Sequence, residues 1–452
     1  MGLESVMAEN CKYLIRNTTA YVGSDFEKIK GTNLLIENGR IKKIGSKIRA
    51  PKDVEIIDGR DFFVTPGFVN AHFHPNQQIN RALGVGISHD KQMDLLHATD
   101  KIKKSKDKET MSYVSVLEGL RAGTTCFQSV GSEIDYQFPV YHKMGVRAAC
   151  VMISKDIIAN NKKKEVRAQV WDPQERIDMA EKQHKENHSD LVRVHFGAVN
   201  VRYSSDELIK GMLSLAEKYD VHFHMHAAEG DEYVASVRER TGSSPVEHLH
   251  SIGALNRRVS LAHMTKLTDS EMGYLAKSGA HVVNCPRANA YVKVGLCPVK
   301  ELLEAGVNVC LGSDAAINNN SNDVRGEAHA IHDAISFKHD YLIDYKTLFS
   351  MLTINGAKAI GLDKEIGTIE EGKRADIVLW DKNDTPFVPG FDYLADIIFT
   401  DGVRAHTVMI DGKLVVKEYR LVSMDERKIL QDARGIAKRY KRAFDDYVAH
   451  HI

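Results

Sequence analysis

The chain has 452 residues, with 61 Lys and Arg residues against 61 Asp and Glu residues, and 43% of its residues are hydrophobic. Polyanions and anionic membranes are bound through concentrated positive charge, so this balance disfavours nucleic acid and membrane surfaces as partners. Residues 1–17 mix charged and polar side chains where a signal peptide needs an apolar stretch, and six scattered Cys residues form no CxxC pair. We therefore expect a cytoplasmic protein without nucleic-acid or membrane partners.

Segments with β-strand character lie near both ends of the chain. The first group covers residues 12–15, 33–37, 40–45 and 55–59, and Asn38-Gly39 predicts a hairpin between the second and third segments. The same pattern returns at residues 376–380, 403–410 and 413–416. We expect residues 1–65 and 366–425 to form one small composite β-sandwich, and residues 426–452 to form a C-terminal helix.

The middle of the chain, residues 66–365, alternates short apolar runs with longer helical segments. The apolar runs lie at residues 64–74, 124–127, 146–152, 191–196, 221–226, 259–263, 281–285 and 307–311. Residues 206–219 are typical of the segments between them, because their apolar side chains recur at helical spacing. Eight strands that alternate with helices predict an α/β fold, a closed parallel (β/α)8 TIM barrel rather than an open sheet.

Polar residues end four of the predicted barrel strands on the side where barrel enzymes place their active sites. The first strand ends in His-Phe-His, and because alternate strand residues share a face, His72 and His74 can reach one metal ion. His226 ends the fifth strand, His263 ends the sixth, and Asp314 follows the eighth. A barrel that buried these five groups without a metal would have to satisfy each one separately. The pattern therefore predicts a metal site.

Other histidines of the middle region lie away from the strand ends. His195 and His224 are expected to support the ligands or to fill the core. His184 and His188 fall in a charged helical segment, so we expect both of them to be solvated.

The strand-end segments resemble motifs of the amidohydrolase superfamily. These segments are VTPGFVNAHFH (64–74), HAAE (226–229), LAH (261–263), NCPRAN (284–289), LGSD (311–314), NNSND (319–323) and GTIEEGKRAD (367–376). Together they resemble the branch that holds the triazine hydrolases and the adenosine-, guanine- and cytosine-type aminohydrolases. The resemblance covers almost the whole chain and implies a distorted barrel with a β-sandwich made from both termini.

The resemblance also implies how a metal is held. Binuclear relatives bridge two ions through a carboxylated Lys at the end of strand four, and the corresponding segment here, LVRVHFG (191–197), contains no Lys. One divalent metal per chain is therefore expected, with His72, His74, His226 and Asp314 as its ligands. Three imidazoles and one carboxylate suit Zn(II), and Fe(II) and Ni(II) are the alternatives.

Catalytic roles follow from the same resemblance. A metal-bound water has its pKa lowered to about 7. Asp314 would take the proton of this water and return it to the leaving group, and His263 would hold the water and stabilise the tetrahedral adduct. Glu229 has the His-x-x-Glu spacing of the branch and would protonate a ring nitrogen. The alternative for Glu229 is a carboxylate that only stabilises a helix N-terminus.

Substrate contacts are predicted at the loops beyond the strand ends. Gln77 follows the first strand and is a candidate for binding a heterocycle, with a surface loop amide as the alternative. Asn289 matches the Asn after strand seven in the branch, so the resemblance implies that it lies near the pocket and is a second candidate. Asn319, Asn320 and Asp323 are equally suited to the turn that holds Asp314, because Asn and Asp satisfy irregular backbone locally.

We expect hydrolytic deamination of a small amino-substituted heterocycle, such as a purine, pyrimidine, pterin or triazine, with release of ammonia. The alternatives are removal of chloride or an alkylamine from a triazine-like ring, cyclic amide hydrolysis and, more remotely, a non-catalytic barrel scaffold. Adenosine-type members usually carry a Trp-Leu pair after strand one, and residues 90–97, DKQMDLLH, lack it. A ligand smaller than adenosylhomocysteine is therefore expected. Members of the branch are commonly dimers or larger, so we expect a homo-oligomer.

Overall fold

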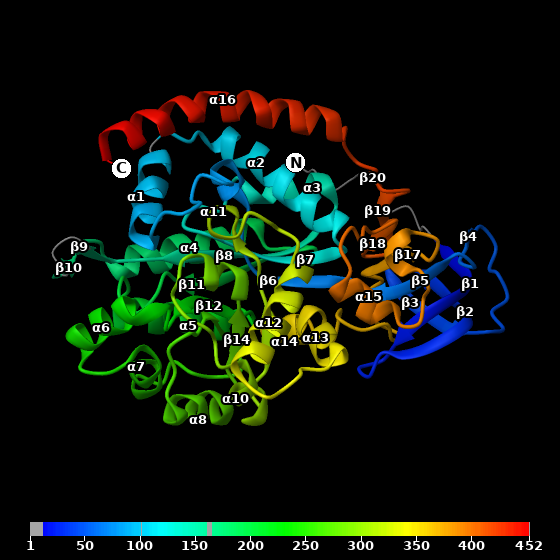
Figure 1. Ribbon diagram of the computed structural model, residues 1–452, viewed down its shortest axis with the longest axis horizontal. Coiled ribbons are helices and arrows are strands. Elements are labelled where there is room, and N and C mark those ends of the chain that lie inside the picture. The colour runs from blue at the N-terminus through cyan, green and yellow to red at the C-terminus, as the bar shows by residue number, and fades with distance from the viewer. Residues whose placement is uncertain (1–11, 101, 161–164, 452) are drawn as a thin grey trace.

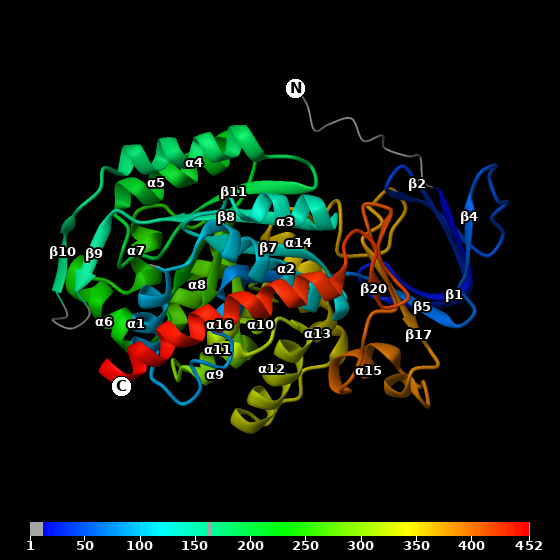
Figure 2. The ribbon, with the colours of Figure 1, turned by 90° about the horizontal axis from the view of Figure 1, so that it is seen from above.

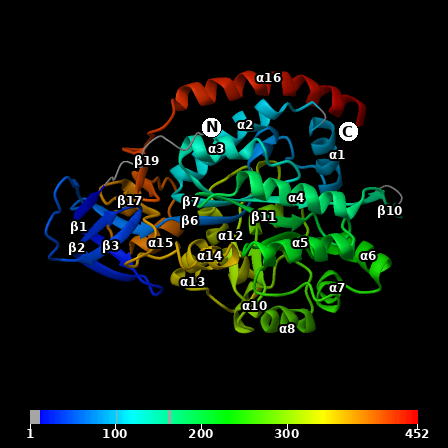
Figure 3. The same ribbon diagram turned by 180° about the vertical axis from the view of Figure 1, so that it is seen from behind.

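The protein has two parts that lie side by side in the computed structural model, which describes residues 12–100, 102–160 and 165–451 (Figure 1). The larger part is a parallel barrel with helices around it, and the smaller part is a sheet built from both ends of the chain. The view from behind shows the same division, with the small sheet beyond one end of the barrel (Figure 3). The predicted fold class is confirmed.

The barrel strands are neighbours in chain order. They are β6 (Phe68–His74), β7 (Thr124–Gly131), β8 (Arg147–Ser154), β11 (Val192–Ala198), β12 (Phe223–Ala227), β13 (Val259–His263), β14 (His281–Asn284) and β15 (Val309–Leu311). The short β16 (Asp314–Ala315) follows β15 in the chain and pairs with β6, with Ala315 opposite His74, which closes the sheet. The eighth predicted strand thus brings Asp314 directly beside the first.

The predicted apolar run 64–74 is divided between the two parts of the molecule. Its first half belongs to β5 (Phe62–Pro66) in the small sheet, and its second half forms β6 in the barrel. Gly67 lies between them, and a Cβ atom there would come within 2.2 Å of the Thr125 side chain. Only glycine fits where the chain passes this closely against β7.

Helices connect the barrel strands and cover the barrel (Figure 2). They are α1 (His89–Asp100), α2 (Ser105–Arg121), α3 (Gln137–Met144), α4 (Pro173–Asn187), α5 (Asp206–Lys218), α6 (Gly230–Thr241), α7 (Pro245–Ser251), α8 (Asp269–Ser278), α9 (Pro286–Tyr291), α10 (Val299–Glu304), α11 (Ala316–Asn319), α12 (Arg325–Lys338), α13 (Tyr345–Leu352) and α14 (Ile354–Ala359). A 3-10 turn, η1 (Pro75–Asn80), follows β6, and a ribbon of β9 (Ile157–Asn160) and β10 (Glu165–Gln169) follows β8. The predicted helix at 206–219 forms α5.

His184 is buried, so the prediction that it is solvated is wrong. Its side chain lies on the buried face of α4, one and two turns beyond Ala180 and Ile177, and its exposed fraction is only 7%. Its Nδ1 lies 2.9 Å from the Val194 carbonyl oxygen, to which it donates. The prediction for His188 holds, because that residue is exposed at the end of the helix.

The small sheet joins the two ends of the chain. Its strand order is β20-β19-β18-β17-β5-β1-β2-β3, and β4 also pairs with β1. The strands are β1 (Tyr13–Val22), β2 (Glu27–Glu37), β3 (Arg40–Gly45), β4 (Glu55–Asp58), β17 (Ile377–Asp381), β18 (Thr407–Ile410), β19 (Lys413–Lys417) and β20 (Arg420–Leu421). The predicted hairpin is present, because Glu37 pairs with Arg40 and the turn residues Asn38 and Gly39 both have positive φ.

Aromatic side chains fill the space where the two parts meet. Trp380 of β17 is fully buried, and its ring centroid lies 5.9 Å from that of Phe68, a residue of the first barrel strand. Its indole Nε1 donates to Thr65 Oγ1 over 2.9 Å, so the buried polar group is satisfied. The turn η2 (Thr385–Phe387) and helix α15 (Tyr393–Phe399) follow β17 beside this cluster.

The predicted C-terminal helix is α16 (Glu426–His451), which crosses the outside of the barrel along α2 and reaches α1 (Figures 1 and 2). Its apolar face packs first on Met111 of α2, through Ala433, Ile436 and Tyr440. Further along, Phe444 joins a cluster that includes several residues of α1. Among the described helices, α16 included, none combines the length and the apolar character that crossing a membrane requires.

Candidate active site

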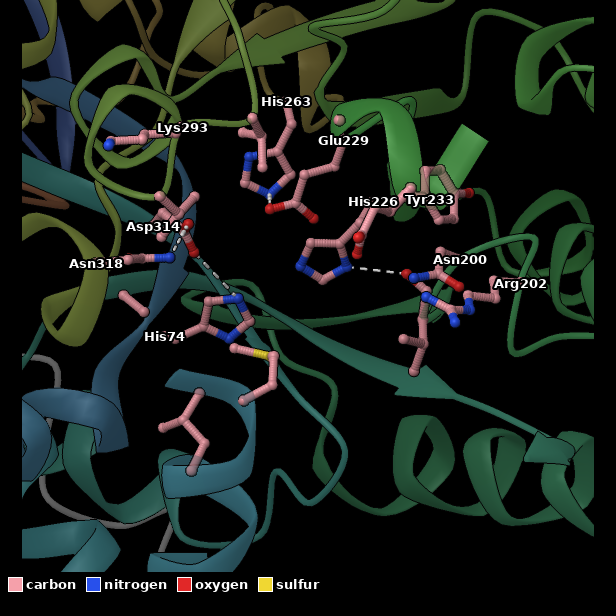
Figure 4. Close-up of a pocket in the computed structure, with 18 of the residues that line it drawn as sticks. His74, Asn200, Arg202, His226, Glu229, Tyr233, His263, Lys293, Asp314 and Asn318 are labelled. Atoms are coloured by element: carbon pink, nitrogen blue, oxygen red, sulfur yellow. Dashed lines mark hydrogen bonds and ion pairs between the residues drawn. The ribbon is translucent and has the colours of Figure 1, made fainter. Parts of the chain in front are cut away.

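The predicted metal ligands meet at the carboxyl end of the barrel strands, and Figure 4 shows three of them, His74, His226 and Asp314. The ring centroid of His72 lies 4.9 Å from those of His74 and His226, and 5.4 Å from that of His263. Oδ1 of Asp314 lies 3.4 Å from Nε2 of His72 and 3.5 Å from Nε2 of His74. Four different strands therefore bring these five side chains to one place, as their positions in the sequence predicted.

Two of these residues have backbone conformations that residues other than glycine rarely adopt. His263 has φ of 75° and Asp314 has φ of 58°. Such conformations are disfavoured for residues other than glycine and cluster at functional sites. Asp314 is held by the residue before it, because Ser313 exchanges two hydrogen bonds with Asn70, at 2.7 and 3.0 Å, and its carbonyl accepts from Asn319 at 2.6 Å. The predicted role of Asn319 in this turn is confirmed.

The barrel backbone orients two of the imidazoles. Nδ1 of His74 lies 3.1 Å from the carbonyl oxygen of Val130, and Nδ1 of His226 lies 2.9 Å from that of Val199. A carbonyl can only accept, so each Nδ1 carries the proton and each Nε2 keeps its lone pair. In each of the two rings, Nε2 faces the centre of the site (Figure 4).

His263 is oriented by a side chain instead. Its Nδ1 lies 2.9 Å from Oδ1 of Asn289, and the Asn289 amide donates to Asn284 at 3.3 Å. Asn289 is 1% exposed and lies outside the set of described residues that line the main cavity. In the structure it therefore supports His263, and its predicted contact with substrate stays a prediction.

Burial gives the imidazoles the charge state that a metal ligand needs. Loss of solvation lowers the pKa of His74, lowers that of His72 well below its usual value, and lowers that of His226 to about 4. Burial alone would raise the pKa of Asp314, but the neighbouring His72 and His263 outweigh it and hold this pKa well below the ordinary range. The site thus presents neutral imidazoles beside a carboxylate, the forms that bind a divalent ion.

The donor set fits a transition-metal ion. Nε2 of His72 is buried and has no hydrogen-bond partner within the described parts of the chain. Candidate ligand atoms lie within 4.8 Å of one another in two overlapping groups, His72 with His226 and His263, and His72 with His74 and Asp314. Imidazole nitrogens with one carboxylate oxygen are the donors that zinc prefers at catalytic sites. The four predicted ligands are all in these groups.

Glu229 lies at the mouth of the site. It is the residue before α6, yet its side chain makes none of the capping hydrogen bonds to the described N–H groups of that helix. Its Oε1 lies instead 3.9 Å from Nε2 of His263, and its carboxylate is directed into the cavity (Figure 4). The geometry therefore favours a role at the site over the alternative of a helix-stabilising carboxylate.

A cavity of about 520 Å³ opens from this centre toward solvent. His74, Gln77, His226, Glu229, His263, Asp314 and Asn318 form its polar inner end. Met93 and Leu96 of α1, together with Val292 and Val294, line its sides, and Arg202 and Lys293 lie further out (Figure 4). Gln77 is in position to contact a ligand, whereas Asn320 is absent from the described lining and bonds to Ala82 and Tyr291.

Sequence reasoning missed two features of this cavity. Asn318 donates to Oδ2 of Asp314 over 2.8 Å, which leaves Oδ1 to face the imidazoles. The signal was its place one helical turn after Asp314, within the Asn318–Asn320 run. The second feature is the apolar wall formed by Met93 and Leu96. From the sequence we inferred only that this segment lacks the Trp-Leu pair, and not that its own apolar side chains line the cavity.

Comparisons with known proteins agree with this geometry. The profile of the amidohydrolase family matches residues 63–415. A 5-methylthioadenosine/S-adenosylhomocysteine deaminase of Carboxydothermus hydrogenoformans is 29% identical over 447 residues, 95% of this chain and 99% of the relative. A 5'-deoxyadenosine deaminase of Methanobrevibacter smithii is 27% identical over 441 residues, 95% of this chain and 98% of the relative.

Solved structures with the same fold include zinc-bound proteins. An adenosine deaminase of Xanthomonas campestris with bound zinc has a TM-score of 0.87 at 24% identity, covering 96% of this chain and 99% of the other. A zinc complex of an atrazine chlorohydrolase of Arthrobacter aurescens has a TM-score of 0.86 at 22% identity, covering 94% of this chain and all of the other, at 100%.

The chain therefore belongs to the amidohydrolase family. It is a hydrolase that acts on C–N bonds of nitrogen heterocycles by deamination, as the sequence analysis expected.

Proposed function

We propose that the protein hydrolyses the exocyclic amino group of the adenine ring in 5'-substituted adenosines. Water is consumed, the C–N bond to the amino group is replaced by a C–O bond, and ammonia leaves. The observation that carries this proposal is the convergence of four imidazoles, Asp314 and Glu229, all of which except His72 line a cavity of about 520 Å³. The curated relatives that match nearly the whole chain are named for such nucleosides.

The size and lining of the cavity are compatible with a nucleoside. Small-molecule sites commonly measure about 300–1,000 Å³ and are mostly apolar with a few convergent polar groups. This cavity falls in that range, with its polar groups at the inner end and the side chains of Met93 and Leu96 along its wall. The lack of the Trp-Leu pair, which favoured a smaller ligand in the sequence analysis, is thus offset by an apolar wall of different composition.

We further propose a single divalent zinc ion held by His72, His74, His226 and Asp314. When bound, such an ion supplies an acidified water and polarises the reacting centre. The low pKa of Asp314 keeps its carboxylate ionised, so it can accept a proton from the attacking water and later deliver it to the departing amine. Asn318 supports this role by fixing the second carboxylate oxygen.

Glu229 and His263 act on the ring and on the oxygen that adds to it. Glu229 is proposed to protonate the ring nitrogen next to the carbon that water attacks, which makes that carbon more electrophilic. His263, whose Nδ1 is held by Asn289, presents Nε2 to the attacking oxygen. Glu229 and Asp314 raise the pKa of His263 although burial lowers it, so this imidazole is the best suited of the four to donate a hydrogen bond.

The test is ammonia release by zinc-loaded protein from a panel of heterocycles. The panel contains 5'-methylthioadenosine, 5'-deoxyadenosine, adenine, cytosine, guanine, an amino-substituted pterin, a chlorotriazine and a cyclic amide. We expect turnover of the adenosines with one ammonia per molecule, and slow or no turnover of the bare bases. Absence of ammonia from every amino-substituted ring, while the triazine loses chloride or a cyclic amide is opened, would overturn the proposal.

The assembly state belongs to the same proposal. A homo-oligomer is expected from the family and is tested by light scattering on the eluted protein, where a monomer mass of 50.6 kDa at assay concentration would contradict it.

A further inference from the structure

His72 is held differently from the other proposed zinc ligands. The Nδ1 atoms of His74 and His226 face backbone carbonyl oxygens. Nδ1 of His72 instead lies 2.8 Å from Nε2 of a second imidazole, that of His224. His72 and His224 are both fully buried, and their ring centroids are 5.0 Å apart.

The contact continues through a third buried side chain. His224 belongs to β12, and its Nδ1 lies 2.8 Å from Oγ of Ser260 on the neighbouring strand β13. His224 and Ser260 are directly paired in the sheet. The hydroxyl of Ser260 donates in turn to the carbonyl oxygen of Phe223 at 3.4 Å. His72, His224 and Ser260 thus form a row of hydrogen-bonded side chains that ends on the carbonyl oxygen of Phe223, which can only accept a hydrogen bond.

Chemistry fixes the direction of this row. For Nε2 of His72 to offer its lone pair to a metal, the proton of the neutral ring must lie on Nδ1. Nε2 of His224 must then accept, which puts the proton of His224 on its own Nδ1. That proton points at Ser260, and the Ser260 hydroxyl points at Phe223. Each group in the row has one role, and these roles leave Nε2 of His72 free to face the centre.

We infer that His224 and Ser260 are positioning residues that fix the ring orientation and the tautomer of His72 for metal binding. The inference rests on the proposed function only in taking His72 as a metal ligand. Partners that hold a ligating histidine through its other nitrogen orient the ring, and their loss typically weakens metal affinity about 10–100-fold. Because Ser260 acts on His72 only through the imidazole of His224, the metal affinity is expected to depend on both His224 and Ser260.

A purely packing role is less consistent with the contacts. His195 is also a buried histidine of the barrel, and neither of its ring nitrogens has a hydrogen-bond partner among the residues described. Both nitrogens of His224, by contrast, are engaged at 2.8 Å. An apolar residue at position 224 would fill the volume but leave the Nδ1–H group of His72 buried and unsatisfied, which is unfavourable.

The experiment measures zinc affinity of the purified full chain by competition with a chelator, independently of turnover. His224→Leu should weaken zinc binding about 10–100-fold. His224→Gln keeps an acceptor oxygen and should recover part of the loss. His222→Leu is the matched control, because His222 is a buried histidine of the same segment that bonds to Ala359 and not to the site.

Ser260→Ala gives a second, milder readout if His224→Leu does not fold. It should weaken zinc binding several-fold in the wild-type background. Where His224→Leu folds, Ser260→Ala should add no further loss to it, since the chain of hydrogen bonds is already broken there. Wild-type zinc affinity in His224→Leu or in Ser260→Ala, or an equal loss in His222→Leu, would overturn the inference.

The outcome is separable from that of the proposed function. If the wild-type chain binds zinc and the variants weaken it, the inference stands even when no adenosine releases ammonia. If the wild-type chain does not bind zinc, both the inference and the proposed metal site fall.

Discussion

A buried ion pair between the two parts of the molecule gives the sharpest stability prediction. Arg147, the first residue of β8, lies with its Nε atom 2.6 Å from Oδ2 of Asp376, which precedes β17. The two side chains are only 2% and 1% exposed. The Arg147 guanidinium also donates to the carbonyl oxygen of Asp190 at 3.1 Å. Burial opposes the charge of Arg147, but Asp376 outweighs it and raises the pKa of Arg147.

Arg147→Met keeps most of the aliphatic stem and removes the charge. The carboxylate of Asp376 would then remain buried without the guanidinium. The backbone N–H of Asp411 would still donate to its Oδ1 over 2.8 Å. Removal of one partner from a buried pair typically costs about 3–5 kcal/mol of the free energy of unfolding. A double variant with Leu at position 376 removes both charges, so we expect it to recover much of that loss.

An exposed pair of equal length provides the control. Arg60 and Asp58 also approach to 2.6 Å, but their side chains are 73% and 55% exposed. Arg60→Met should leave stability unchanged, because water already solvates both groups. Urea unfolding followed by tryptophan fluorescence, to which buried Trp380 contributes, and by circular dichroism compares the variants. If Arg147→Met unfolds at the same urea concentration as Arg60→Met, burial is not what sets the strength of the pair.

Three further predictions concern turnover. Asp314→Asn should abolish ammonia release while the circular dichroism spectrum stays that of the folded protein, and substantial remaining activity would contradict Asp314 as the base. Glu229→Gln should lower kcat about 10²–10⁴-fold with bound zinc unchanged, whereas Glu239→Gln, on the exposed face of α6, should have no effect. Phe444→Ala should raise KM several-fold with kcat nearly constant, because Phe444 packs behind the apolar wall that α1 gives to the cavity. Lys438→Ala on the same helix is its control, and equal KM values in both variants would exclude this support.

The strand-end residues could be predicted because their signal is local. An apolar run sets a barrel strand, and the polar residue at its end then falls at the mouth of the barrel. His72, His74, His226, His263 and Asp314 each follow this rule, so their convergence needed only the fold class.

The supporting contacts could not be predicted because they join residues far apart in the chain. Asn70 and Ser313 are 243 positions apart, and their pairing depends on how the barrel closes. The 3.6-residue pattern of α16 predicts a helix with one apolar face, yet it does not say which surface that face covers. His184 was within reach of sequence reasoning, because it continues the helical stripe of Ile177 and Ala180.

The central claim is that a single zinc ion at this centre makes the protein a nucleoside deaminase. It is tested most directly by adding zinc stepwise to metal-free protein and measuring ammonia release from 5'-methylthioadenosine. We predict that turnover is absent without metal, rises linearly with added zinc and levels off at one equivalent per chain. Turnover that survives complete metal removal, or no ammonia at one bound zinc per chain, would contradict the account.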